Sequence, residues 1–376
     1  MSPTIRDVAD LANVSFQLVS AVLAGKKYAR ASESTRKRIF ESAEKLGYVP
    51  SVSARILKGG ESKVLGVLVD SRAPSVVHSL LAEIEHVADL QGYRLLVAQA
   101  HDNPEKLLAS FHSLKQYGVD GILSLAHDYP LLSGELREKL LKEKNLVFVL
   151  NTAGEESCAV DVDIEEAMAR AVKHLRTQQY RKAALLITGD EEKLEALSAS
   201  CRKRVEGFRK CVPEGRILFV PDITVNEEAA RKVCRRLAEK DLEKESIDCV
   251  IAQNDYMAAL LMKELLQCGK KIPQEVGVIG WDNLFIGECT AVTLTTFHYD
   301  RKELAECAVQ KLLSRIRGEE ETGKICLKLK MTVRESTQRD PLTGEGKNKK
   351  RYRKPFGMRL AGKQMKLIFP TQPLRV

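Results

Sequence analysis

The sequence predicts a small all-α helix-turn-helix headpiece followed by an α/β core of two doubly wound parallel-sheet lobes. Two observations support this fold class. The first 50 residues carry short amphipathic helical patterns separated by turn residues, and from Lys63 onward short apolar runs alternate with helix-length segments. Continuous apolar strands alternating with helices are typical of parallel sheets covered on both faces.

The first two helices are predicted from their caps and apolar spacing. Thr4 can form a capping box with Asp7, and Asn13 ends the first helix because Asn tolerates a left-handed backbone. Ser15 is a suitable N-cap for the second helix, across a turn short enough for a helix-turn-helix. The residues predicted to face inward are Val8, Leu11, Ala12, Val19, Val22 and Leu23, and those left on the outer face of the second helix are Phe16, Gln17, Ser20 and Ala21.

A third helix is predicted from Ser34 to Leu46, with Gly47 as its stop. The outer face of this three-helix unit is basic, which suits contact with DNA phosphates. A small helical bundle with a solvated basic face is the alternative interpretation of the same pattern.

Charge is concentrated at the two ends of the chain. Residues 1–58 carry ten Lys/Arg and five Asp/Glu, residues 338–376 carry eleven and two, and the segment between holds 39 and 44. Basic ends around an acidic middle suggest contact with a polyanion at the ends, although a basic end is also compatible with a solvated surface.

The chain carries no sign of a membrane span, a metal site or a catalytic motif. Apolar runs fall short of the roughly 18–20 residues that cross a bilayer, and the N-terminus lacks the apolar region of a secretory signal. The nine cysteines include no CxxC pair, which favours reduced thiols in the cytoplasm. Walker, GxGxxG, GxSxG and HExxH motifs are lacking, so we expect no cofactor and no enzyme.

Polar residues follow several of the predicted strands, at the edge where open parallel sheets bind ligands. They are Asp70, Ser71, Asn151, Asn254, Asp255 and Asp282. Each one alone is compatible with capping the next helix, but their convergence favours a cleft lined with hydrogen-bonding groups. The strands themselves are predicted at 64–69, 93–98, 119–125, 146–150, 183–188, 217–220, 248–252 and 276–280.

The headpiece resembles the N-terminal signature of the lac-repressor (LacI/GalR) family of transcription regulators, in TIRDVADLANVSFQLVSAVL and STRKRIFESAEKLGYVPSVSARILK. The resemblance implies a second helix in the DNA major groove and a hinge helix whose Leu57 wedges into the minor groove. Ala21 departs from the family pattern, which has Arg there, so one guanine or phosphate contact is lost. The DNA-binding residues implied are Thr4, Ser15, Phe16, Gln17, Ser20, Ala21, Arg55, Leu57 and Lys58.

The core resembles the periplasmic-binding-protein-like sensor of the same family, in RVEGF, QNDYMA, GWDN and LTTFHYD. The resemblance implies that Arg204, Asn254 and Asp282 bind an effector, which we expect to be a sugar or sugar derivative. Ser71 and Asn151 are expected to contribute because they follow the first and fourth predicted strands. Two departures bear on the ligand. Asn283 replaces a second Asp, and Ile223 stands where sugar-binding members often carry an aromatic residue.

These features together predict a homodimeric repressor that binds double-stranded operator DNA and responds to a small ligand. An uptake binding protein would share the core but needs a signal peptide, and an enzyme with a DNA-binding appendage remains the other alternative. The predicted boundaries are 1–50 for the headpiece, 51–61 for the hinge helix and linker, 62–337 for the core and 338–376 for a basic, disordered tail.

Removing residues 340–376 should flatten the salt dependence of DNA affinity while leaving the thermal midpoint and the preferred DNA sequence unchanged. The reason is that a flexible cationic segment contacts phosphates without reading bases. Thermal unfolding and DNA titrations at several salt concentrations test this. A large fall in the midpoint would mean that the tail docks, for example through MKLIF at 365–369, and an unchanged salt slope would favour an inert tail.

Overall fold

The structure of the protein is a computed structural model. It describes residues 3–25, 29–50, 56–57, 59–69, 75–99, 104–125, 134–150, 158–191, 197–319 and 323–339. Four of the site residues predicted above (Arg55, Lys58, Ser71 and Asn151) lie outside these ranges, as do Asp70 and the tail from 340 onward. Within the described ranges no helix is long and apolar enough to cross a membrane.

The headpiece contains the three predicted helices, α1 (Ile5–Ala12), α2 (Phe16–Leu23) and α3 (Glu33–Leu46). Thr4 and Asp7 form the predicted capping box, and the Ser15 side chain accepts from the Leu18 N–H at the start of α2. Asn13 is left-handed, with φ of 49°, so the turn between α1 and α2 forms as its sequence predicts. The third helix begins one residue earlier than predicted, because Ser32 is its N-cap.

One predicted core residue of the headpiece is wrong. Leu11 is 43% exposed, and Ala9 is buried in its place. The buried stripe of α1 therefore runs through Val8, Ala9 and Ala12, which pack against Val19, Val22 and Ile39 of the other two helices. Two residues from the predicted basic face have structural bonds, since Arg38 donates to the Ala12 carbonyl over 2.9 Å and Arg36 to the Ala29 carbonyl over 2.6 Å.

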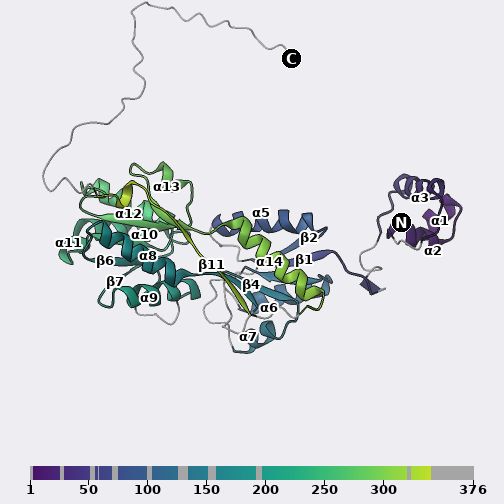
Figure 1. The fold of residues 1–376 in the computed structure, drawn as a ribbon, viewed down its shortest axis with the longest axis horizontal. Helices are drawn as coiled ribbons and strands as arrows, with labels where there is room; N and C mark the ends of the chain where they lie inside the picture. Colours follow the sequence, from purple (N-terminus) through teal and green to yellow (C-terminus); the bar gives the residue numbers. More distant parts are fainter. Residues whose placement is uncertain are drawn as a thin grey trace, which may run out of the picture. The chain divides into compact units, whose positions relative to one another are not determined.

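The core consists of two six-stranded sheets, which confirms the predicted fold class (Figure 1). The first sheet has the order β11-β5-β4-β3-β1-β2 and is parallel, and the second has the order β12-β10-β9-β8-β6-β7, with β12 alone antiparallel. The strands are β1 (Val64–Val69), β2 (Arg94–Gln99), β3 (Gly121–Ser124), β4 (Leu146–Val149), β5 (Ala159–Val162), β6 (Ala183–Thr188), β7 (Arg216–Val220), β8 (Cys249–Ala252), β9 (Gly277–Trp281), β10 (Thr295–His298), β11 (Lys324–Leu327) and β12 (Lys330–Thr332).

Helices cover both faces of each sheet. In the first lobe α5 and α14 pack on one face and α6 and α7 on the other; in the second lobe α8 and α9 oppose α10 and α12. The bounds of these helices are α5 (Ser75–Leu90), α6 (Pro104–Gln116), α7 (Gly134–Leu141), α8 (Ile164–Thr177), α9 (Ala199–Cys211), α10 (Glu227–Arg236), α12 (Asp255–Gln267) and α14 (Arg301–Ile316). Shorter turns are the π-helix at Leu237–Asp241, α11 (Leu242–Lys244), α13 (Ile286–Cys289) and the 3₁₀ turn at Glu335–Thr337.

The described chain passes between the lobes three times, from β5 to α8, from β10 to α14 and from β11 to β12. The four strands that the sequence did not predict, β5, β10, β11 and β12, are the strands next to these crossings. They are short and contain polar or charged residues, so their local pattern is weak. Pairing with neighbouring strands of the two sheets stabilises them.

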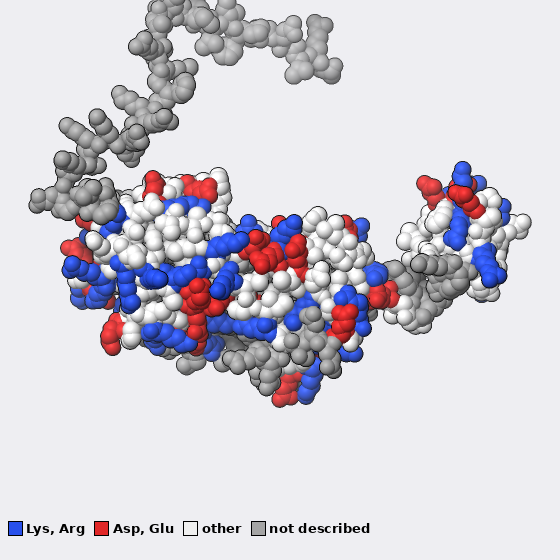
Figure 2. Space-filling model, in the orientation of Figure 1, with Lys and Arg blue, Asp and Glu red and all other residues white. Residues whose placement is uncertain are grey.

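Charges of both signs are mixed over the face of the core in Figure 2. Many are i,i+4 ion pairs on helices, such as Arg231 with Glu227 and Lys232 with Glu228. The last described residue, Arg339, belongs to the second lobe. Its guanidinium lies 3.7 Å from the centre of the Tyr180 ring and donates to the Gln179 carbonyl over 3.0 Å, so the core extends to this position.

Candidate functional site

The headpiece presents α2 as its candidate recognition helix. Phe16 is 44% exposed, and Gln17 is exposed beside it, while Val19 and Val22 are buried. Ser20 and Ala21 are half-buried, so the outer face of α2 is narrower than predicted. Thr4 and Ser15 are the N-caps of α1 and α2. The N–H groups in the first turn of each helix suit a neighbouring phosphate.

Leu57 has the exposure that a wedge residue needs. Its side chain is 88% exposed, and it stands in a short helical segment with Ile56. A single exposed leucine is common on protein surfaces, so the proposed wedge role rests on the position of Leu57 in the hinge motif. Its predicted neighbours in the hinge, Arg55 and Lys58, lie outside the described residues.

In the core, the structure brings three predicted residues together at one pocket between the lobes. Arg204, Asn254 and Asp282 come from α9, the start of α12 and the end of β9. The first lobe contributes an aliphatic wall, and the second lobe contributes the polar groups and two aromatic rings. The pocket is lined by Val76, Val77, Leu150, Val162, Ile164, Ser200, Arg204, Gln253, Asn254, Trp281, Asp282 and Tyr299.

Arg204 is held over an aromatic stack. Its guanidinium lies 4.7 Å from the centre of the Trp281 ring, and Trp281 in turn stacks on Phe297 at 5.0 Å. One Arg204 amino group donates to the Ser200 carbonyl over 3.2 Å. Such stacking fixes the plane of the guanidinium and directs its remaining N–H groups.

Two buried polar groups of the pocket have no hydrogen-bond partner among the described residues: the Arg204 Nε and the Tyr299 hydroxyl. Their residues are only 8% and 6% exposed. Burial also raises the pKa of the Tyr299 hydroxyl, so it remains a protonated donor. Leaving such groups unpaired costs about 1–3 kcal/mol each, which a ligand with acceptor atoms would recover.

Asn254 caps a helix and also lines the pocket. Its side-chain oxygen caps α12 by accepting from the Met257 N–H over 2.9 Å. Asp282 follows β9 with a φ of 102°, a conformation that L-residues rarely adopt. Its N–H donates to the Phe297 carbonyl over 2.6 Å, which holds this strained position at the pocket.

One predicted cleft residue is placed elsewhere. The Asp255 carboxylate turns into the protein, where it accepts from the Thr296 hydroxyl over 2.7 Å and the Leu284 N–H over 2.6 Å. A Cβ at Gly280 would collide with the same carboxylate, so this position requires glycine. Asp255 therefore fixes the backbone beneath Asp282 instead of facing the ligand site.

Ile223 also lies outside the cleft. It lines an apolar hollow of about 600 Å³ beside α12 and α13, together with Tyr256, Leu260 and Leu266. Asn283, the other departure from the family pattern, accepts from Arg334 over 2.9 Å, so it has a structural bond.

The sequence patterns did not single out the four other polar or aromatic lining residues, Ser200, Gln253, Trp281 and Tyr299. Trp281 and Tyr299 stand within the motifs GWDN and LTTFHYD. The motifs therefore identified the right segments, but not these two side chains, as part of the pocket. Tyr299 directly follows β10, a strand that the sequence did not predict, so its place at a strand end is evident only in the structure.

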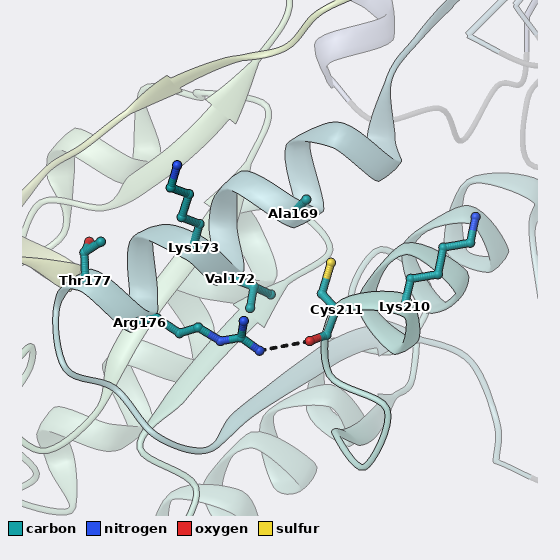
Figure 3. Close-up of a pocket in the computed structure, with 7 residues that line it drawn as sticks. All are labelled: Ala169, Val172, Lys173, Arg176, Thr177, Lys210 and Cys211. Carbon is teal, nitrogen blue, oxygen red and sulfur yellow. Dashed lines mark hydrogen bonds between the residues drawn. The ribbon is translucent and has the colours of Figure 1, made fainter.

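A second hollow, between α8 and α9, is a weaker candidate (Figure 3). It is lined by Lys173, Arg176, Lys210 and Cys211 among others. Arg176 donates to the Cys211 carbonyl over 3.0 Å, and Lys210 pairs with Glu165 at 2.6 Å. Two of its three cations thus have partners already, and its basic side chains are solvent-exposed.

The comparisons with known proteins match both parts of the chain. Residues 4–51 match the bacterial regulatory proteins of the lacI family, and residues 172–337 match the periplasmic binding protein-like domain. The repressor PurR of Vibrio parahaemolyticus serotype O3:K6 is 31% identical over 327 residues, which cover 86% of this chain and 94% of the relative.

Solved structures give the same fold. A lac repressor dimer bound to operator and the anti-inducer ONPF superposes with a TM-score of 0.77 at 23% identity, covering 90% of this chain and 99% of that one. The regulator CelR in complex with cellobiose gives a TM-score of 0.59 at 22% identity, covering 89% and 99%.

The chain combines a helix-turn-helix with a two-lobed core that has a pocket between its lobes. This combination defines a DNA-binding transcription regulator with a ligand-binding core. The chain belongs to the lacI family of bacterial regulatory proteins, to which both its headpiece and its 31% identical relative assign it.

The buried Asp255 should make the stability of the core depend on pH in an unusual direction. Burial raises the pKa of this carboxyl from 3.8 to about 7, and the nearby Asp282 adds to the rise, although the bonds from Thr296 and Leu284 oppose it. Between these values the folded protein holds a proton that the unfolded chain has released. The contribution of Asp255 to the free energy of unfolding is therefore largest below about pH 4 and falls as the pH rises to about 7.

The measurement is chemical denaturation of the protein and of Asp255→Asn from pH 4 to pH 8. The difference in unfolding free energy, protein minus variant, should fall by up to about 4 kcal/mol over this range. A difference that stays level, or that rises with pH, would contradict the elevated pKa.

Proposed function

We propose that the chain is a homodimeric repressor whose affinity for a two-fold symmetric operator is controlled by a small ligand bound between its lobes. The observation that carries the proposal is the pocket shared by the two lobes, where Arg204, Asn254 and Asp282 meet. A ligand that contacts both lobes stabilises one arrangement of the lobes, and operator affinity changes if that arrangement differs in its affinity for DNA.

The proposed ligand is a sugar or sugar derivative. The unpaired Arg204 Nε and Tyr299 hydroxyl favour a ligand with acceptor oxygens, and the Asp282 carboxylate suits a hydroxyl donor. Solved relatives in complex with cellobiose and with ONPG point in the same direction. Ser71 and Asn151, which follow the first and fourth predicted strands, are proposed as further contacts from the first lobe.

The proposed DNA contacts are the outer residues of α2 and the hinge. Gln17 can bond to an adenine edge through both atoms of its amide, and Phe16 and Ala21 can pack against a thymine methyl. Ser20, Ser15 and Thr4 are proposed to contact the backbone. In the hinge, Leu57 is proposed to enter the minor groove between Arg55 and Lys58.

A second copy of the chain is the proposed cover for an apolar surface on the second lobe. Phe285 is 77% exposed, Tyr256 38% and Leu266 36%, and the last two line the apolar hollow beside α12. Exposed patches of this kind mark interaction sites, and a solved relative is a dimer bound to operator. Two headpieces related by a two-fold axis match a palindromic site.

We propose that the pocket binds a ligand without catalysing a reaction. We also propose that the protein acts in the compartment that contains the DNA. PurR and the lac repressor, both named above, are repressors, and the groups at the pocket are suited to hold a ligand through hydrogen bonds. Turnover of a bound sugar by the purified protein would favour the alternative of an enzyme with a DNA-binding appendage.

Gln17→Ala should relax the base preference at one position of each half-site, at a cost of about 1–3 kcal/mol in specific binding. Selection of bound sequences from random DNA, carried out with the protein and with the variant, measures this. Gln91→Ala, an exposed glutamine of the core, is the control and should leave the selected sequence unchanged. Selected sites without two-fold symmetry, or an unchanged preference in Gln17→Ala, would refute the assignment.

Arg204→Ala should weaken effector binding by about 2–5 kcal/mol, because it removes one partner of a buried polar contact. A thermal-shift screen of sugars and sugar acids finds a ligand, and calorimetry then compares the protein, Arg204→Ala and Asp282→Ala. Arg202→Ala, on the same helix but outside the pocket lining, is the matched control. DNA binding without ligand should persist in each variant, and wild-type affinity in Arg204→Ala would exclude the proposed site.

A further inference from the structure

A buried carboxylate joins the two lobes beside the pocket. Asp161 lies in β5, the strand that leads into the first crossing, and its side chain is 1% exposed. One carboxylate oxygen accepts from the Val162 N–H over 2.9 Å. The other lies 2.6 Å from the Lys203 Nζ and 3.1 Å from the Lys324 Nζ.

The two lysines come from different lobes. Lys324 is in β11, which pairs with β5 in the first sheet, whereas Lys203 is in α9, which packs against the second sheet. The neighbours of the pair line the pocket, with Val162 following Asp161 and Arg204 following Lys203. The same carboxylate thus has one partner that moves with its own lobe and one that does not.

The pair has an electrostatic reason to favour closed lobes. Burial alone would raise the pKa of the Asp161 carboxyl, but the charges and bonds of Lys203, and then of Lys324, lower it overall, so the group is ionised. An ion pair with a buried member is screened by water less than an exposed pair, so it holds its partners together more strongly. Separation of the lobes would remove Lys203 and leave the carboxylate with Lys324 alone.

The space in the pocket that water molecules can occupy is about 70 Å³. Binding of a larger ligand between the lobes depends on how far they separate, and the strength of any interlobe contact affects how often they do. We infer that the Lys203–Asp161 ion pair is a latch between the lobes and that these two residues position the lobes around the cleft. The inference concerns the ligand-free protein and stands apart from the nature of the effector.

The test compares Lys203→Met with Lys324→Met in the full chain without ligand. Both variants remove an ammonium group from the same carboxylate oxygen, but only the first removes an interlobe contact. Hydrogen–deuterium exchange is measured on peptides that cover the first turns of α9 and α12. The amides of these turns lie at the cleft and lack acceptors within their helices, so their exchange reports opening.

Exchange in these peptides should be about tenfold faster in Lys203→Met and no more than about twofold faster in Lys324→Met. Asp161→Asn should match Lys203→Met, the double variant should add nothing further, and Lys203→Arg should restore slow exchange. Thermal midpoints verify that each variant is folded. Equal acceleration of exchange by the two Lys→Met variants would mean that both lysines only stabilise the structure around Asp161, which would overturn the latch. Unchanged exchange in Lys203→Met would also overturn it.

Discussion

The shared pocket between the lobes is the constraint on which the functional structure depends. Its aliphatic wall comes mainly from the first lobe, while Arg204, Asn254 and Asp282 come from the second, so neither lobe forms the pocket alone. Three crossings of the chain join the lobes, and the strands next to them are short. Any ligand that contacts both walls would therefore be coupled to the relation between the lobes, which is the physical basis of the proposed control over DNA binding.

The groups at the pocket are supported by a layer of residues that do not face it. Phe297 lies behind Trp281, and Trp281 behind Arg204, so an aromatic stack orients the guanidinium. Asp255 holds the backbone beneath Asp282 through Thr296 and Leu284. This supporting layer explains how a strained residue and two unpaired polar groups persist at one place, since the surrounding bonds determine their positions.

The motifs found the segments of the site better than its individual side chains. QNDYMA placed two adjacent polar residues at the end of β8, and the structure separates them, with Asn254 at the pocket and Asp255 buried below it. Tyr299 was missed because it follows β10, whose sequence TTFH has no clear apolar pattern. Ile223 was aligned with a ligand-stacking position but lies in the hollow beside α12. The differences at Asp255 and Ile223 concern the direction of a side chain, which spacing along the chain does not specify.

The sequence by itself determined the helix-turn-helix, the alternation of strands and helices, and the three residues that meet at the pocket. These features depend on residues close together in the chain, so a short stretch of sequence predicts them. Examples are the caps Thr4 and Ser15, the left-handed turn at Asn13 and the apolar runs of the central strands. Only the tertiary structure decided the four strands at the crossings, the exposure of Leu11, and the meeting of Asp161 with lysines from two lobes. These features depend on contacts between residues far apart in the chain, and no local pattern encodes which distant partner a strand or a charge will meet.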